Sequence, residues 1–129
     1  MTWLLCFSWL IAYPSETYAF AIRIKCETDP NFKWTPLIAK SYAKGYIKLY
    51  YPQWHHREWV ALAQLWGKES AWKHTAQNKK SSAYGIPQLL KLEPGTPAPL
   101  QIERGLAYIS TRYGKPSLAW KHWLKKGWY

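Results

Sequence analysis

The sequence predicts a single small domain that is mainly α-helical. Four segments place apolar residues at the three- and four-residue spacing of an amphipathic helix. Proline or glycine stands near the ends of these segments, where helices commonly begin and end. No internal repeat and no convincing strand pattern is present. The length of 129 residues suits one domain of about 100–150 residues rather than a multidomain enzyme.

The first 21 residues have the pattern of an export signal. Residues 2–13 are uncharged and mostly apolar, but this run is shorter than the about 20 apolar residues of a membrane-spanning helix. Ala19 and Ala21 supply the A-x-A pattern of a cleavage site. No Lys or Arg comes before Arg23, so a buried N-terminal helix is the alternative. We expect cleavage after Ala21, location in the periplasm or cell wall, and no stable membrane span.

Residues 22–36 are predicted to be an irregular segment that leads into a domain at 37–129. Thr35 followed by Pro36 has the form of an N-cap with proline at the first helical position. A helix is therefore expected over 37–50.

Three further helices are expected. The second and clearest covers 53–69, where the apolar positions fall on one face: Trp59, Leu62, Ala63, Leu65 and Trp66. A polar loop and a proline-rich connector separate it from a third helix at 100–113, for which Gly114 is a natural C′ residue. Pro116 begins a short final helix that stops at Gly127.

The chain is strongly basic and rich in aromatic residues. It has 18 Lys and Arg against 7 Asp and Glu, a net charge of +11, and ten Trp and ten Tyr. Such charge points to a polyanion, which could be nucleic acid, anionic lipid or a bacterial wall. Lysines are scattered from Lys25 to Lys126 without an Arg-rich run, which disfavours a dedicated nucleic-acid site. The surplus aromatic rings suit stacking on sugars or nucleobases.

Cysteine and histidine give no sign of a disulfide or a metal site. Cys6 would leave with the signal, and Cys26 would then be unpaired. The four histidines do not have the H-E-x-x-H spacing, and no cysteine pair accompanies them. We therefore expect neither a metal nor another cofactor.

Glu69 is the candidate catalytic residue. It follows Leu65 by four positions and Trp66 by three, so it shares the apolar face of its helix. Partial desolvation and the negative end of the helix dipole both raise the pKa of a carboxyl, while Lys68 opposes them. A raised pKa suits a general acid.

Several short motifs follow one another within residues 52–129. They are Glu69-Ser70-x-Trp72, Ala76-Gln77-Asn78, Ser81-Ser82-Ala83-Tyr84-Gly85-Ile86-Pro87-Gln88 and Tyr108-Ile109-x-x-Arg112-Tyr113-Gly114. Together they resemble a lytic transglycosylase. The resemblance is closest to the transglycosylase-like domains of exported bacterial proteins and phage tape-measure proteins, and it implies a small lysozyme-like domain.

The resemblance implies that Glu69 cleaves the bond between N-acetylmuramic acid and N-acetylglucosamine in peptidoglycan. The carboxyl would first protonate the glycosidic oxygen and then accept a proton from the muramyl 6-hydroxyl, leaving a 1,6-anhydro end. An ordinary glycosidase instead uses two carboxylates, about 5–5.5 Å apart for retention or about 6.5–9.5 Å apart for inversion. Only Glu93 and Glu103 follow Glu69 among the acidic residues, so a second carboxylate is poorly supplied.

The resemblance also implies which residues bind the glycan. Ser70 would orient the carboxylate or the substrate, Gly85 would permit close backbone approach, and Gln88 would hydrogen-bond sugar hydroxyls and acetamides. The family's Gly-Leu-Met-Gln has Pro87 at its third position here, which removes a backbone N–H.

The tyrosine that the family places beside its catalytic Glu is replaced by Trp120, which lacks a phenol. Either Tyr108 or Tyr113 supplies the phenol instead, or Trp120 stacks on sugar, or the site is weakened. Helical spacing of Trp120 with Trp123 also fits a simple core position.

Three functions are therefore considered. The first is an exported lytic transglycosylase acting on peptidoglycan strands; the second is a peptidoglycan-binding module of the same fold without activity. The third is a basic protein that binds nucleic acid or membrane. On the first interpretation we expect a monomer that does not bind nucleic acid, acting alone or within a larger envelope-spanning or phage assembly.

Overall fold

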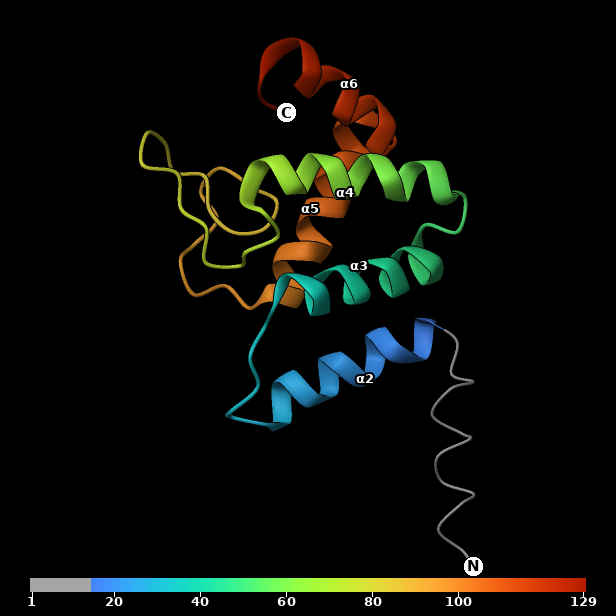
Figure 1. Cartoon of the computed structure of the whole chain (residues 1–129), viewed down its shortest axis with the longest axis vertical. Coiled ribbons are helices and arrows are strands. Elements are labelled where there is room, and N and C mark those ends of the chain that lie inside the picture. Colours follow the sequence, from blue (N-terminus) through green and yellow to red (C-terminus); the bar gives the residue numbers. More distant parts are fainter. Residues whose placement is uncertain (1–14) are drawn as a thin grey trace, which may run out of the picture.

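The computed structural model describes residues 15–129, which are folded mainly as helices (Figure 1). This part of the chain contains no sheet, only isolated bridges that join Tyr84 to Gln77 and Leu89. The mainly α-helical class is thereby confirmed. The five helices are α2 (Ser15–Thr28), α3 (Pro36–Tyr50), α4 (His56–Ser70), α5 (Ala98–Tyr113) and α6 (Pro116–Lys126).

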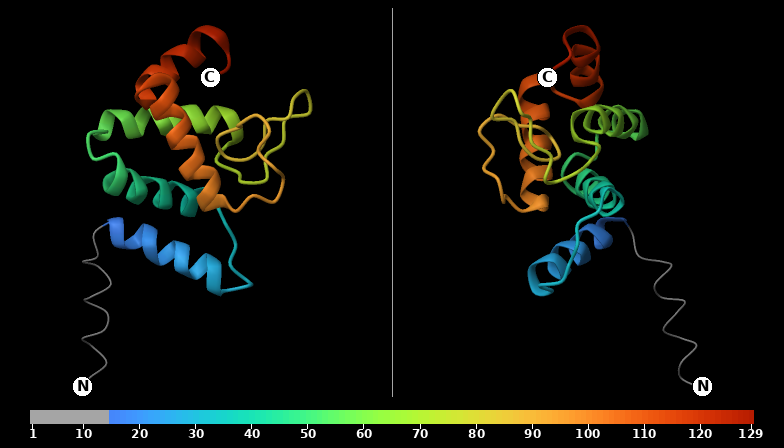
Figure 2. Two further views of the ribbon diagram at one scale, coloured as in Figure 1. Left: turned by 180° about the vertical axis from the view of Figure 1, so that it is seen from behind. Right: turned by 60° about the vertical axis from the view of Figure 1, so that its left-hand side comes forward.

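Four of the described helices lie one above another in the order α2, α3, α4 and α6, and α5 crosses them (Figure 1). α2 lies against α3, and α6 lies against α4 on the other side of the molecule (Figure 1). Seen from behind, α5 runs across α3 and α4 to reach α6 (Figure 2). The core lies where α5 crosses, and its fully buried side chains include Leu62, Leu65, Trp66, Ile102, Leu106 and Ile109.

Close approach of α5 to α4 depends on Gly105. A Cβ at this position would lie 2.7 Å from the Trp66 ring and 2.7 Å from the Pro87 side chain. Any larger residue would therefore push α5 away from α4 and from the loop that follows α4. This crossing holds the loop against the end of α4.

Local signals set the helix ends much as the sequence predicts. The Thr35 side chain accepts a hydrogen bond from the Ile38 N–H, and Pro36 opens α3. Gly114 and Gly127, both at positive φ, end α5 and α6. The second predicted helix begins at His56 rather than at 53, because a turn hydrogen-bonds the Trp54 N–H to the Tyr51 carbonyl.

The prediction that residues 22–36 are irregular is wrong for 22–28, which belong to α2. Phe20 and Ile24 of this helix are exposed, and it docks through Ala19 and Ile22 together with polar contacts. Arg23 forms an ion pair with Glu103 of α5. Contacts of this kind, between residues distant in sequence, leave no periodic pattern.

The predicted signal peptide, residues 1–21, lies only partly within the described residues. Residues 1–14 lie outside the described residues, and 15–21 form the first half of α2, where Ala19 is buried. Cleavage after Ala21 stays a prediction. Among the helices of residues 15–129, none is long and apolar enough to cross a membrane.

Candidate active site

Glu69 lies in the last turn of α4, facing α6. Its Oε1 accepts a hydrogen bond of 2.7 Å from Nε1 of Trp123. The side chain is half-buried, and burial raises the pKa of its carboxyl, while the Trp123 hydrogen bond acts in the opposite direction. The net shift is upward, which decides between the opposing influences that the sequence left open. A carboxyl of this kind keeps its proton to higher pH than a solvated one and can act as a general acid.

The turn after Glu69 reverses the chain and brings a long loop back over the end of α4. Ala71 and Trp72 both adopt positive φ, which ends the helix sharply. Ser70 Oγ donates a hydrogen bond of 2.7 Å to the Ile86 carbonyl and accepts one of 3.1 Å from the Trp72 N–H. Ser70 is buried, so its hydroxyl fixes the loop to the helix rather than facing a ligand.

Gln101 of α5 anchors the same loop from the other side. Its Oε1 accepts from the Ile86 N–H at 2.9 Å, and its Nε2 donates to the carbonyls of His74 at 2.9 Å and Thr96 at 2.8 Å. Gly85 has φ +82°, and a Cβ there would collide with the Gln101 amide. Gly85 is thus required for the approach of the loop to α5, which differs from the predicted approach of its backbone to a glycan.

Gln88 closes the loop on itself. Its Nε2 donates to the Ala76 carbonyl at 2.9 Å and to the Gly85 carbonyl at 2.8 Å. Both amide hydrogens are therefore used within the protein, and Gln88 can offer a ligand only its amide oxygen. The predicted glycan-binding residues Ser70, Gly85 and Gln88 come together, but mainly to hold the loop in shape.

A cluster of tyrosines lies beside this loop and supplies a phenol near Glu69. Tyr129 Oη accepts from Trp66 Nε1 at 2.9 Å and donates to the Pro87 carbonyl at 2.6 Å. Burial raises the pKa of Tyr129, and the negative charge of Glu69 adds to the effect.

Tyr108 and Tyr113, the predicted sources of that phenol, stand one ring further away. Their ring centroids lie 5.7 Å and 6.2 Å from that of Tyr129. The guanidinium of Arg112 lies over both rings, at 5.9 Å and 5.6 Å from their centroids. Tyr108 and Tyr113, together with Arg112, therefore pack behind Tyr129 and are not partners of Glu69.

Trp120 acts through Trp123. The two indole rings stack with centroids 5.3 Å apart and planes inclined by 16°. Trp120 therefore packs against the indole that donates to Glu69. This role differs from both predicted roles, which were stacking on a sugar and a simple core position. Trp123 was not expected to be a partner of Glu69. The one signal for it in the sequence is that a partly buried indole N–H needs a hydrogen-bond acceptor.

Other carboxylates are occupied elsewhere. Glu103 accepts a 2.7 Å hydrogen bond from the Tyr42 hydroxyl in addition to its ion pair with Arg23. Glu93 is exposed and borders a cavity of about 550 Å³ at the connector before α5. Within residues 15–129 no three His, Cys, Asp or Glu side chains come together as metal ligands.

The chain matches no protein-family model, no curated protein and no solved structure.

Proposed function

We propose that this chain is a lysozyme-like lytic transglycosylase that cleaves peptidoglycan strands at the bond between N-acetylmuramic acid and N-acetylglucosamine. One observation carries the proposal: Glu69 is half-buried, its pKa is raised by burial, and a single hydrogen bond from Trp123 fixes its orientation. Such a carboxyl is protonated at higher pH than a surface glutamate and is aimed by a rigid donor.

In this mechanism Glu69 protonates the glycosidic oxygen as the bond breaks. The resulting carboxylate then accepts the proton of the muramyl 6-hydroxyl while that oxygen attacks the anomeric carbon. The glycosidic bond to the departing sugar is replaced by an internal acetal bond from the 6-oxygen to the anomeric carbon, and no water is consumed. One carboxyl is sufficient because the substrate supplies the nucleophile. This suits a chain in which Glu58 and Glu103 are engaged elsewhere, Glu58 by Ser117 and Glu103 by Tyr42 and Arg23.

The surroundings of Glu69 support glycan binding. The loop over the end of α4 is held by Ser70 and Gln101, so its shape is fixed before a ligand arrives. Aromatic rings beside it suit the apolar faces of sugars. The net charge of +11 favours association with an anionic wall. We further propose that the protein is exported and acts as a monomer, alone or within an envelope-spanning or phage assembly.

A non-catalytic peptidoglycan-binding module is the second candidate, and the Tyr129 hydroxyl favours it. This phenol already donates to Pro87 and accepts from Trp66, so it is less available to assist proton transfer than a free phenol. Binding to purified wall without any released product would support this alternative.

The test is digestion of purified peptidoglycan by the wild type and by two matched variants, Glu69→Gln and Glu93→Gln. Each variant replaces one carboxylate by an amide. The Glu93 side chain is exposed, and only the backbone carbonyl of this residue takes part in the turn with Thr96, so the substitution leaves the loop contacts intact. We expect soluble fragments with anhydromuramyl ends from the wild type and Glu93→Gln, and none from Glu69→Gln. Equal release by all three would refute the proposal.

A further inference from the structure

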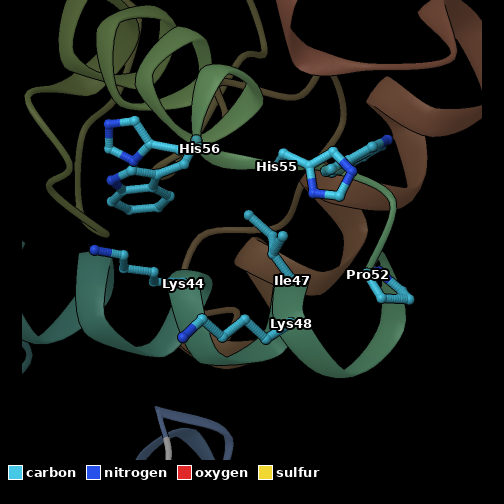
Figure 3. Close-up of a pocket in the computed structure, with 8 residues that line it drawn as sticks. Lys44, Ile47, Lys48, Pro52, His55 and His56 are labelled. Carbon is cyan, nitrogen blue, oxygen red and sulfur yellow. The ribbon is translucent and has the colours of Figure 1, made fainter.

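A basic pocket lies at the opposite end of α4 from Glu69. It encloses about 480 Å³ between the last turns of α3 and the start of α4. In Figure 3, Lys44 and Lys48 extend from α3 on one side, His55 and His56 stand at the start of α4 on the other, and Ile47 lies between them. The lining contains four basic side chains and no carboxylate.

This pocket is separate from the proposed catalytic site. Glu69 is about 20 Å along the helix axis from His56, at about 1.5 Å of rise per residue. The two sites also face different neighbours: Glu69 contacts α6 through Trp123, whereas Trp59 of the pocket contacts α3, with Lys44 Nζ 5.7 Å from its ring centroid.

Nothing in the pocket neutralises its positive charge. Glu58, the acidic residue in the first turn of α4, is turned toward α6 and accepts two hydrogen bonds from Ser117. The N-cap residue His55 makes no side-chain capping hydrogen bond, so the partial positive charge of the helix start remains beside the pocket. The lining is therefore complementary to an anion.

We propose that this pocket binds a phosphate group carried on a sugar or polyol. Two lysines of α3 and two histidines at the start of α4 line the pocket from two sides. All four can donate hydrogen bonds to phosphate oxygens, and lysine binds phosphate as a point charge. A phosphate ion alone would leave most of the volume empty, because cavities of about 300–1,000 Å³ hold drug-sized ligands. Pro52, Trp54 and Trp59 in the lining offer apolar surface to the carbon skeleton of the ligand.

The row of lysines on α3 extends beyond the pocket. Lys40, Lys44 and Lys48 follow one another at four-residue spacing, and Lys40 Nζ lies 6.0 Å from the centroid of the Trp72 ring. A ligand with repeated phosphate groups could therefore contact more than one lysine of this row. The site goes beyond the proposed glycan cleavage and does not depend on it.

The test is an NMR titration of the wild-type protein with glucose 6-phosphate, following the His55 and His56 imidazoles and the Trp59 indole. Glucose, glucuronate and inorganic phosphate are the matched probes. We expect glucose 6-phosphate to shift these signals and to bind at least about tenfold more tightly than any of the other three. Binding no tighter than that of inorganic phosphate or glucuronate would overturn the proposal.

A pair of charge-matched variants separates the pocket from general attraction. Lys44→Gln/Lys48→Gln removes two charges from the pocket, and Lys79→Gln/Lys80→Gln removes two from an exposed loop. All four lysines are exposed, so both variants should fold, which circular dichroism checks. We expect at least about tenfold weaker glucose 6-phosphate binding for the first pair and less than about twofold for the second. Equal weakening would overturn the proposal.

Larger probes identify where the phosphate is carried. Poly(glycerol phosphate) presents it on a polymer, and vesicles of phosphatidylglycerol present it on a lipid surface. Sensitivity of either to Lys44→Gln/Lys48→Gln supports the phosphate site and names the source. A single-stranded oligonucleotide that displaces glucose 6-phosphate at lower concentration than poly(glycerol phosphate) would assign the pocket to nucleic acid and overturn the proposal.

Discussion

Two glutamates on α4, Glu58 and Glu69, both face α6 but differ in burial and in the number of hydrogen bonds they accept. Glu58 and Glu69 are about three helical turns apart and both contact α6. Glu58 is buried, and its two oxygens accept from the Ser117 N–H at 2.7 Å and the Ser117 hydroxyl at 2.9 Å. Glu69 is half-buried and receives one hydrogen bond, from Trp123.

The difference lies in how fully each carboxylate is satisfied. Glu58 binds the first turn of α6, where the backbone N–H groups and the helix dipole favour a negative charge. Its charge thus joins two helices. Glu69 has less compensation for its burial, so the pKa of its carboxyl is raised. On one helix, the completely paired carboxylate is structural and the incompletely paired one is available for chemistry.

The largest expected effect is on catalysis. Glu69→Gln should reduce wall cleavage by about 10²–10⁴-fold, because it removes the only proposed acid and base. Glu58→Gln should leave the rate per folded molecule within about twofold of wild type. Release of soluble fragments from labelled peptidoglycan measures both. A loss for Glu58→Gln as large as for Glu69→Gln would remove the functional distinction between the two residues.

For the free energy of unfolding, substitution of Glu58 should have a larger effect than substitution of Glu69. Glu58→Ala leaves the Ser117 N–H and hydroxyl without their acceptor, and we expect it to lower the free energy of unfolding by about 2–3 kcal/mol. Ser117→Ala should lower it by about 1 kcal/mol, and the double variant should cost less than the sum. Urea denaturation measures these values. Additive losses would mean that the two residues do not act as a pair.

The next effect is on the pH dependence of cleavage. The Trp123 hydrogen bond favours the carboxylate of Glu69, so Trp123→Phe should raise the pKa of Glu69 further. Since the acid must be protonated, the alkaline limb of kcat/KM should move to higher pH, by up to about one unit. Trp120→Phe keeps the donor and serves as the control. A shift to lower pH in Trp123→Phe would contradict the assignment of the hydrogen bond.

The smallest effect is on the pH dependence of stability. The folded-state pKa of Glu69 lies above its unfolded value, so its protonated form stabilises the fold at low pH and that contribution is lost as pH rises through the folded pKa. Glu69→Gln, which carries no charge, should therefore be more stable than wild type at pH 7, by less than about 1 kcal/mol given its partial exposure. The difference should shrink in acid. Thermal unfolding at pH 4 and pH 7 measures it, and a less stable Glu69→Gln at pH 7 would show that the charge is not disfavoured.

Local patterns in the sequence predicted α3, α4, α5 and α6 and the partial desolvation of Glu69, but not α2. Capping residues such as Thr35 and Gly114 act on their own helices, so their effect can be seen in the sequence. The apolar periodicity of α4 likewise indicated that Glu69 shares the core face and is partly desolvated. These features depend on residues within a few positions of one another.

The partners of Glu69 could not be predicted in the same way. Trp123 is 54 positions from Glu69, and the contact of Tyr129 with Pro87 spans 42 positions. Gln101 holds the loop by three hydrogen bonds, one of which reaches the His74 carbonyl 27 positions away. Such contacts depend on how α5 and α6 cross α4, and local periodicity contains no information on that crossing.

The central claim is that one carboxyl, Glu69, transfers protons while the substrate supplies the nucleophile. Digestion of peptidoglycan in water enriched in ¹⁸O, followed by mass spectrometry of the released ends, tests it most directly. We predict anhydromuramyl ends without ¹⁸O from the wild type and no new ends from Glu69→Gln. Reducing ends that contain ¹⁸O would show that water attacks the anomeric carbon, and would contradict the claim.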